Sequence, residues 1–238
     1  PLITEGLHPL PELLEGGHGR QRWARRPLLI SKAPQASVLL AVPFLCAMLS
    51  DRLLKKVFAF NLKKVELPKG IDVLDPFRGK NAQEVRRIVT LFHQQYYSDE
   101  RSRLLMLGIN PGRLGAGSTG ICFTDTKRCE SDLGIAVAGL RTHEPSSDFF
   151  YRAIRAAGGP KAFYDRVYVQ AVCPLGFTRM GPKGTPVNLN YYDDSALQEA
   201  ITPVVVQWLR DLIATGLRTD VMCCVGTGKN LAFLEKLN

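Results

Sequence analysis

Short apolar runs alternate with longer amphipathic segments along most of the chain. Three runs are almost wholly apolar, at residues 103–108, 167–172 and 221–225. Runs of this length without polar alternation are typical of strands buried on both faces of a parallel sheet. Apolar residues elsewhere recur every three or four positions, which predicts helices over 49–60, 84–97, 146–157, 196–215 and 229–237. We therefore expect an α/β fold, a three-layer α/β/α sandwich around a short, mostly parallel central sheet.

Long loops follow the first two predicted strands, at residues 109–134 and 173–190. In parallel sheets the loops after the carboxyl ends of the strands form the ligand-binding crevice. Loops of this length are usually functional or disordered. We therefore expect the functional site near these two loops.

Residues 1–48 differ from the rest of the chain. Glycines, prolines and an arginine cluster interrupt this segment, and it sustains no hydrophobic period. We expect a poorly ordered or appended N-terminal segment at 1–48 and a single domain at 49–238. The longest apolar run, at about 37–49, contains Pro43 and is too short to cross a membrane, so we expect no membrane association.

The composition is that of a globular protein with a polyanionic partner. Hydrophobic residues make up 45% of the 238 residues and charged residues 22%, which argues against a disordered or collagen-like chain. Lys and Arg number 31 against 22 Asp and Glu, and the resulting net charge of +9 favours nucleic acid as a partner. The six cysteines form no C-x-x-C pair, and no His stands at a ligand spacing beside them. We therefore expect neither a disulfide scaffold nor a metal or other cofactor.

The strongest local signal begins where the first predicted strand ends. The sequence G-I-N-P-G occupies 108–112, and T-G-I-C-F follows at 119–123. Glycines let a backbone approach a ligand closely, and Pro111 stiffens the turn after Asn110, so we expect the Asn110 carboxamide to face the crevice. Phe123 lies in the same loop, where its ring can stack on a flat ligand. The alternative is that Asn110 and its neighbours form only a strand-ending turn.

The wider spacing resembles the uracil-DNA glycosylase superfamily. It reads G-x-N-P-G-x-x-G, then T-G-x-x-F, then Leu133-Gly134-Ile135, and it is most similar to the single-strand-selective monofunctional uracil-DNA glycosylases and their bacterial relatives. A second block at 172–175, V-C-P-L, stands where that family carries an N-H-C-P-L segment. The resemblance covers about residues 49–238. It implies a four-stranded parallel sheet and a DNA glycosylase of base-excision repair that hydrolyses the N-glycosidic bond of uracil or another deaminated base, with no metal and no lyase step.

The resemblance also implies roles for individual residues. Asn110 matches the residue that positions the attacking water, and Phe123 matches the ring that stacks on the flipped base. The remaining substrate-binding residues that we expect are Gly108, Ile109, Pro111, Gly112, Ala171, Val172, Cys173 and Pro174. An amide is too weak a base to deprotonate water, so positioning would supply most of the catalysis.

Two departures from the family pattern bear on activity. The family Asn that reads the edge of uracil aligns with Ala171, whose methyl group cannot hydrogen-bond, and the neighbouring Gln170 is expected to face the other side of the strand. Base preference therefore stays open. The family's fourth strand and the His-containing loop after it have no counterpart before Asn238, so we expect the fourth strand to be missing and catalysis to be weakened.

Two alternatives to an active glycosylase stay open. One is a catalytically impaired DNA- or nucleotide-binding protein of the same fold, and the other is a phosphate-binding α/β enzyme that uses the glycine-rich loops. For the glycosylase we expect a monomer that binds single-stranded or damaged double-stranded DNA inside the cell, in a bacterial cytoplasm or a eukaryotic nucleus. Arg179 and Lys183 are expected to contact the DNA backbone from a flexible loop. Asp125 is expected to be solvated, with a second catalytic group as the alternative.

Overall fold

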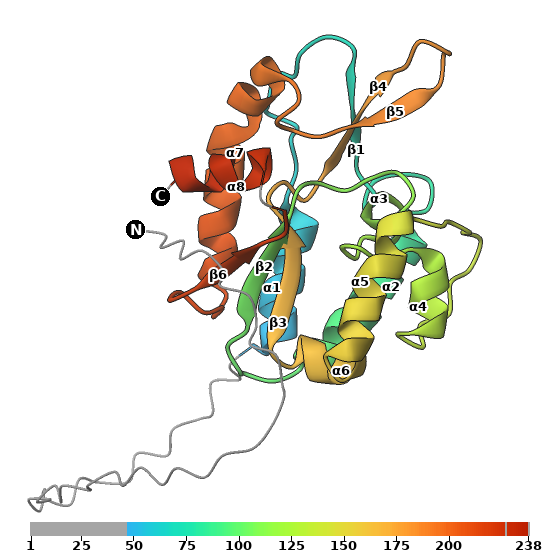
Figure 1. The fold of residues 1–238 in the computed structure, drawn as a ribbon, viewed down its shortest axis with the longest axis vertical. Coiled ribbons are helices and arrows are strands. Elements are labelled where there is room, and N and C mark those ends of the chain that lie inside the picture. Colours follow the sequence, from blue (N-terminus) through green and yellow to red (C-terminus); the bar gives the residue numbers. More distant parts are fainter. Residues whose placement is uncertain (1–46, 227, 238) are drawn as a thin grey trace, which may run out of the picture. The chain divides into compact units, whose positions relative to one another are not determined.

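The computed structural model describes residues 47–226 and 228–237 of the chain (Figure 1). The N-terminal segment predicted at 1–48 lies almost wholly outside the described residues, so its boundary stays a prediction. The elements, in chain order, are α1 (Leu49–Ala59), β1 (Ile71–Leu74), α2 (Ala82–Tyr97), β2 (Leu104–Gly108), α3 (Ala116–Thr119), α4 (Thr126–Ser131), α5 (Pro145–Ala156), α6 (Gly159–Tyr164), β3 (Val167–Ala171), β4 (Gly176–Met180), β5 (Pro186–Leu189), α7 (Ser195–Ile213), β6 (Met222–Cys224) and α8 (Lys229–Lys236).

The three predicted apolar runs form one parallel sheet in the order β3-β2-β6. Every residue of β3 is buried, as are Leu105 and Leu107 of the central strand β2. In the register of the β2–β3 pair, Gly108 stands beside Ala171, so both strands end at the same edge of the sheet. The prediction of a short parallel sheet is therefore confirmed, with three strands among the described residues.

Helices cover both faces of this sheet, as the sequence pattern predicts. In Figure 1, α7 and α8 lie on one side of it, and α2, α5 and α6 lie on the other. Trp208 of α7 donates its indole N–H to the carbonyl of Ala171 at 3.4 Å. Phe92 of α2 packs edge-on against Tyr164 of α6, with ring centroids 5.0 Å apart. No helix in the described part of the chain is both long enough and apolar enough to cross a membrane.

A second, antiparallel sheet has the strand order β1-β4-β5. The prediction of a long loop over 173–190 is therefore wrong, because β4 and β5 form a hairpin within it. The turn is closed by the Gly181 N–H, which donates to the Thr185 carbonyl at 2.9 Å, and Gly184 adopts a φ of 68°. The glycines and prolines of this turn are typical of a loop, and the sequences of the two short strands beside them are not apolar. The hydrophobic pattern alone therefore does not predict these strands.

Candidate active site

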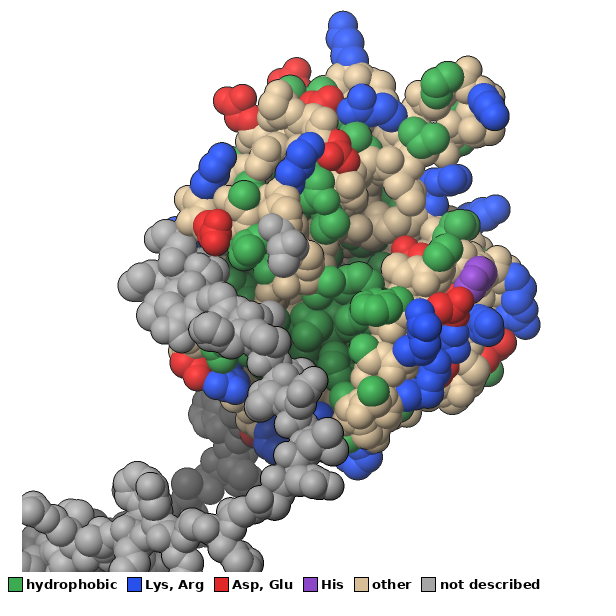
Figure 2. Space-filling model, in the orientation of Figure 1, with side chains coloured by type: hydrophobic (Ala, Val, Ile, Leu, Met, Phe, Trp, Pro, Cys, Tyr) green, Lys and Arg blue, Asp and Glu red, His purple; other side chains and the backbone are tan. Residues whose placement is uncertain are grey.

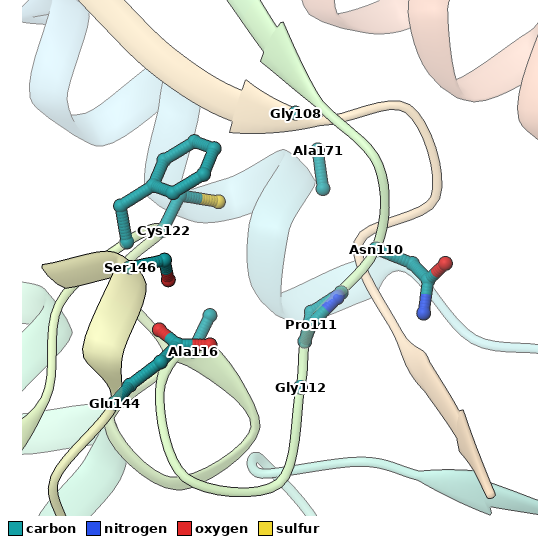
Figure 3. A pocket seen from close by; sticks show the side chains of 10 residues that line it. Gly108, Asn110, Pro111, Gly112, Ala116, Cys122, Glu144, Ser146 and Ala171 are labelled. Atoms are coloured by element: carbon teal, nitrogen blue, oxygen red, sulfur yellow. The ribbon is translucent and has the colours of Figure 1, made fainter. Parts of the chain in front are cut away.

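A cavity opens at the carboxyl ends of β2 and β3 (Figure 3). Its lining comes from both strand ends, from the glycine-rich loop after β2, and from the segment that leads into α5. The lining residues are Gly108, Asn110, Pro111, Gly112, Ala116, Cys122, Phe123, Glu144, Ser146 and Ala171. Six of the ten site residues predicted from sequence are among them.

The other four predicted residues, Ile109, Val172, Cys173 and Pro174, are not among the lining residues and follow the ends of β2 and β3 in the chain. The Val172 N–H donates to the Gly108 carbonyl at 3.0 Å, and the Cys173 N–H donates to the Ile109 carbonyl at 3.2 Å. These bonds continue the β2–β3 pairing beyond the strands and hold the start of the glycine-rich loop. Val172 and Cys173 are fully buried, and Pro174 is buried as well. Their contact with a substrate stays a prediction.

Asn110 is held at both ends of its carboxamide. Its Nδ2 donates to the Leu189 carbonyl at 3.1 Å, and its Oδ1 accepts from the Tyr191 N–H at 3.0 Å. These bonds fix which end is the acceptor and tie the loop after β2 to the end of β5. In Figure 3 the carboxamide points away from Cys122 and Glu144. A carbonyl oxygen has two lone pairs, so Oδ1 retains one with which it can accept a hydrogen bond from water.

Phe123 is held in place as a flat platform. Its backbone adopts a φ of 55°, which is rare for a bulky residue and persists only where the surroundings enforce it. Its ring stacks on Phe150 with centroids 4.4 Å apart and an interplanar angle of 20°. A Cβ at Gly108 would lie 2.9 Å from the Phe123 Cζ, so glycine at 108 lets the ring sit against the strand end. With Phe150 behind it, the half-buried ring has a supported position in the cavity wall.

Glu144 lies over the glycine-rich loop. A Cβ at Gly115 would be 1.8 Å from the Glu144 Oε2, and one at Gly112 would be 3.3 Å from Oε1. The two glycines therefore make room for this carboxylate, and Figure 3 shows it close to Ala116. Burial raises the pKa of Glu144 and so does the nearby Asp125, while the hydroxyl of Ser146 acts in the opposite direction.

Asp125 organises the segment that carries Glu144. Its side chain is fully buried and accepts hydrogen bonds from the backbone N–H groups of Glu144 and Arg128, both at 2.9 Å, and from the Ser147 hydroxyl at 2.8 Å. The expectation of a solvated Asp125 is therefore wrong, and the side chain caps α4 as a structural anchor. Burial raises the pKa of Asp125, but these hydrogen bonds outweigh it, and the net shift is downward.

Sequence reasoning missed Ala116, Cys122, Glu144 and Ser146 as cavity residues. No motif marks Glu144 or Ser146, because they come from a segment more than thirty residues after Asn110 and reach the cavity only through the fold. Cys122 donates its thiol to the Gln170 Oε1 at 3.3 Å, and burial raises its pKa to about 12, so it remains a thiol. Within the described ranges, no group of three or more His, Cys, Asp and Glu side chains is placed to hold a metal ion.

Basic side chains lie on the surface around the cavity. Figure 2 shows Lys and Arg side chains gathered over the part of the molecule that contains α4 and α5. Arg113, directly after the cavity residue Gly112, is exposed, and so is Lys183 in the β4–β5 turn. Arg179 instead pairs with Asp194 at 3.1 Å. The surface therefore offers exposed cations from the glycine-rich loop and the hairpin to a polyanion.

Comparison with known proteins identifies similar chains. Residues 94–236 match the family model described as the uracil DNA glycosylase superfamily. Among solved structures, the crystal structure of SMUG2 from Pedobacter heparinus is 41% identical in sequence, with a TM-score of 0.77. The match covers 80% of this chain and 81% of that one. No match was found among curated proteins.

Proposed function

Because this chain belongs to the uracil DNA glycosylase superfamily, we propose that it is a monofunctional DNA glycosylase of base-excision repair that releases uracil or another deaminated base from DNA. One observation carries the proposal. The cavity brings together Asn110, immobilised by two hydrogen bonds to backbone, and Phe123, supported from behind by Phe150. A site with a fixed water-orienting amide beside a flat platform suits hydrolysis at a sugar that bears a planar base.

The target base must first leave the DNA stack, which costs least in single strands and mismatches. The base would then stack on Phe123, an interaction that accepts any flat ring. The free lone pair of the Asn110 Oδ1 would accept a hydrogen bond from water and aim its oxygen at C1′ of the deoxyribose. A new C1′–O bond forms as the C1′–N bond breaks. The base leaves with the bonding electron pair, and the water loses its proton to solvent.

The departing base carries negative charge, so donors in the cavity lower the barrier. The Ser146 hydroxyl lines the cavity and has one proton to donate, so it would serve this purpose by rotating from Glu144 toward the departing base. The exposed Arg113 and Lys183 would contact phosphates on either side of the flipped nucleotide. Single-stranded DNA, or duplex with a mismatched uracil, is therefore the substrate we propose for this chain.

Base release from a labelled single-stranded oligonucleotide that contains one uracil tests the proposal. Alkali should break the strand at the site of release, and omission of alkali should leave it intact because the enzyme is monofunctional. Asn110→Ala should slow release by roughly 10²- to 10⁴-fold, the range for a positioned polar catalytic group. Asn61→Ala, in the turn after α1, is the matched control and should keep the parent rate.

Asn110→Ala also removes two hydrogen bonds to the β5 segment, so the melting temperature of each variant must be measured. Asn110→Asp retains an oxygen that can accept from the Tyr191 N–H. Comparing its melting temperature and release rate with those of Asn110→Ala should separate the anchoring role of residue 110 from its catalytic role. Release at the parent rate by a folded Asn110→Ala would refute the assigned role of Asn110. Binding of the oligonucleotide by the parent chain without any release would refute the enzymatic proposal and favour a DNA-binding protein of this fold.

A further inference from the structure

The cavity contains a carboxylate that the water-positioning and stacking roles leave unused. Glu144 is half-buried, and it reaches the cavity from the segment before α5. We propose that the Glu144 carboxylate accepts a hydrogen bond from a ring N–H of the flipped base and thereby selects bases that carry this donor. This inference rests on the proposed function and concerns its base specificity.

The backbone around Glu144 is held by several hydrogen bonds. Its N–H donates to Asp125, and its carbonyl accepts from the N–H of Ser147 at 3.0 Å and from the Ser147 hydroxyl at 2.7 Å. The carboxylate itself occupies the space left by the absent side chains of Gly112 and Gly115. A half-buried polar side chain that lines a cavity and stands on a backbone held in this way has the geometry of a specificity determinant.

The other polar side chains of the lining are less suited to this role. The Asn110 carboxamide is bonded to backbone at both ends and points away from Glu144. The Cys122 thiol is directed to Gln170, and Ala171 presents only a methyl group where the related enzymes are expected to carry a base-reading Asn. Ser146 is a hydroxyl that can donate to a base carbonyl. Glu144 is therefore the lining side chain best suited to accept from a ring N–H.

Deamination changes the group on the pairing edge of the base that would face the Glu144 carboxylate. Cytosine and adenine present an unprotonated ring nitrogen on their pairing edge, whereas uracil and hypoxanthine present a ring N–H at that position. A carboxylate facing this position attracts the N–H and repels the lone pair of the unmodified base. A site built to hydrogen-bond an N–H also rejects analogues that lack it, because its buried polar group is left unpaired.

The test compares uracil with 3-methyluracil, which lacks the N3–H, in otherwise identical single-stranded oligonucleotides. Release rates are measured under single-turnover conditions for the parent, Glu144→Ala, Glu144→Gln and Gly115→Ala. In Gly115→Ala the new methyl group displaces the carboxylate without removing it. Glu199→Ala, on the exposed side of α7, is the control. Melting temperatures show whether each variant is folded.

The parent should release uracil far faster than 3-methyluracil. Glu144→Ala and Gly115→Ala should narrow this ratio by roughly 10- to 100-fold, the range for a hydrogen bond to a charged group. Glu144→Gln, which retains an acceptor oxygen, should keep most of the ratio, and Glu199→Ala should keep all of it. An unchanged ratio in folded Glu144→Ala, even with slower rates for both bases, would overturn the inference and leave the proposed function intact. Failure of the parent to release uracil would overturn both.

Discussion

A methyl group at Gly108 should disable the stacking platform without touching any polar group of the site. The Cβ of Gly108→Ala would lie 2.9 Å from the Phe123 Cζ and 3.1 Å from Cε2. Carbon atoms pack best at about 3.5–4.0 Å, so the ring must retreat by at least roughly 0.6 Å. Phe150 lies against one face of the ring at a centroid distance of 4.4 Å and is itself buried, so the ring cannot move in that direction. We expect the displaced ring to tilt, which would turn its stacking face away from the base.

The expected loss follows from the value of base stacking. Stacking of a base on an aromatic side chain contributes about 1–3 kcal/mol, so Gly108→Ala should slow uracil release by about 5- to 150-fold. The added methyl also crowds the packing and should lower the free energy of unfolding by about 1–3 kcal/mol. Gly79→Ala is the matched control, because a Cβ there meets nothing closer than 3.7 Å. It should retain the parent rate.

A double-mutant cycle with Phe123→Ala isolates the mechanism. If Gly108→Ala acts by displacing the ring, it should have little further effect on the rate once the ring is absent. Release rates under single-turnover conditions and urea unfolding curves provide both readouts. Fully additive effects of the two substitutions on the rate would refute the reasoning, because they would show that residue 108 acts independently of Phe123.

Three further predictions concern the scaffold. Burial lowers the pKa of His93 to about 4, so between pH 6.5 and 4 the unfolded chain binds more protons than the folded chain. The free energy of unfolding, measured by urea unfolding, should therefore fall by up to about 3 kcal/mol as the pH drops through this window. His93→Gln should make the free energy of unfolding less dependent on pH in the same window. Arg103 is fully buried and donates to Asp99 at 3.0 Å and to three backbone carbonyls. Arg103→Met should therefore cost about 3 kcal/mol of stability in the same assay, and a loss below 1 kcal/mol would contradict the buried pairing. Asp125→Ala should lower the melting temperature and slow uracil release, because it frees the backbone that carries Glu144. Asp125→Asn keeps an acceptor oxygen and should have a smaller effect on the melting temperature and on the release rate.

The parallel core was predictable because its strands carry their own signal. The run at 103–108 is apolar and ends in Gly108, and the structure places β2 there as the central strand. Asn110 and Phe123 could be placed near the cavity because a motif keeps them thirteen residues apart within one loop. Local pattern suffices where a site is built from one strand end and the loop that follows it.

The rest of the site could not be found in this way. Glu144 precedes α5 and has neither a motif nor a periodic pattern, and its backbone N–H is bound by Asp125, a residue nineteen positions earlier. Apolar character alone predicts that Phe149 is buried in the core, but the structure leaves it 67% exposed, whereas its neighbour Phe150 is buried and stacks on Phe123. Which of two adjacent aromatic residues faces inward depends on the rotation of the helix, and one residue of error in the helix boundary reverses the answer.

The missed hairpin matters most for mechanism, because it sets the orientation of Asn110. The carboxamide bonds to backbone on either side of the end of β5, and β5 pairs with β4, which in turn pairs with β1. The position of the water-orienting oxygen therefore depends on three short strands that share no hydrogen-bonded ladder with the parallel sheet. Catalysis by positioning tolerates little displacement, since an error of about 1 Å costs roughly 10²-fold in rate. If Asn110 orients the water as we propose, substitutions that loosen the hairpin should lower the rate of base release before they lower the stability of the core.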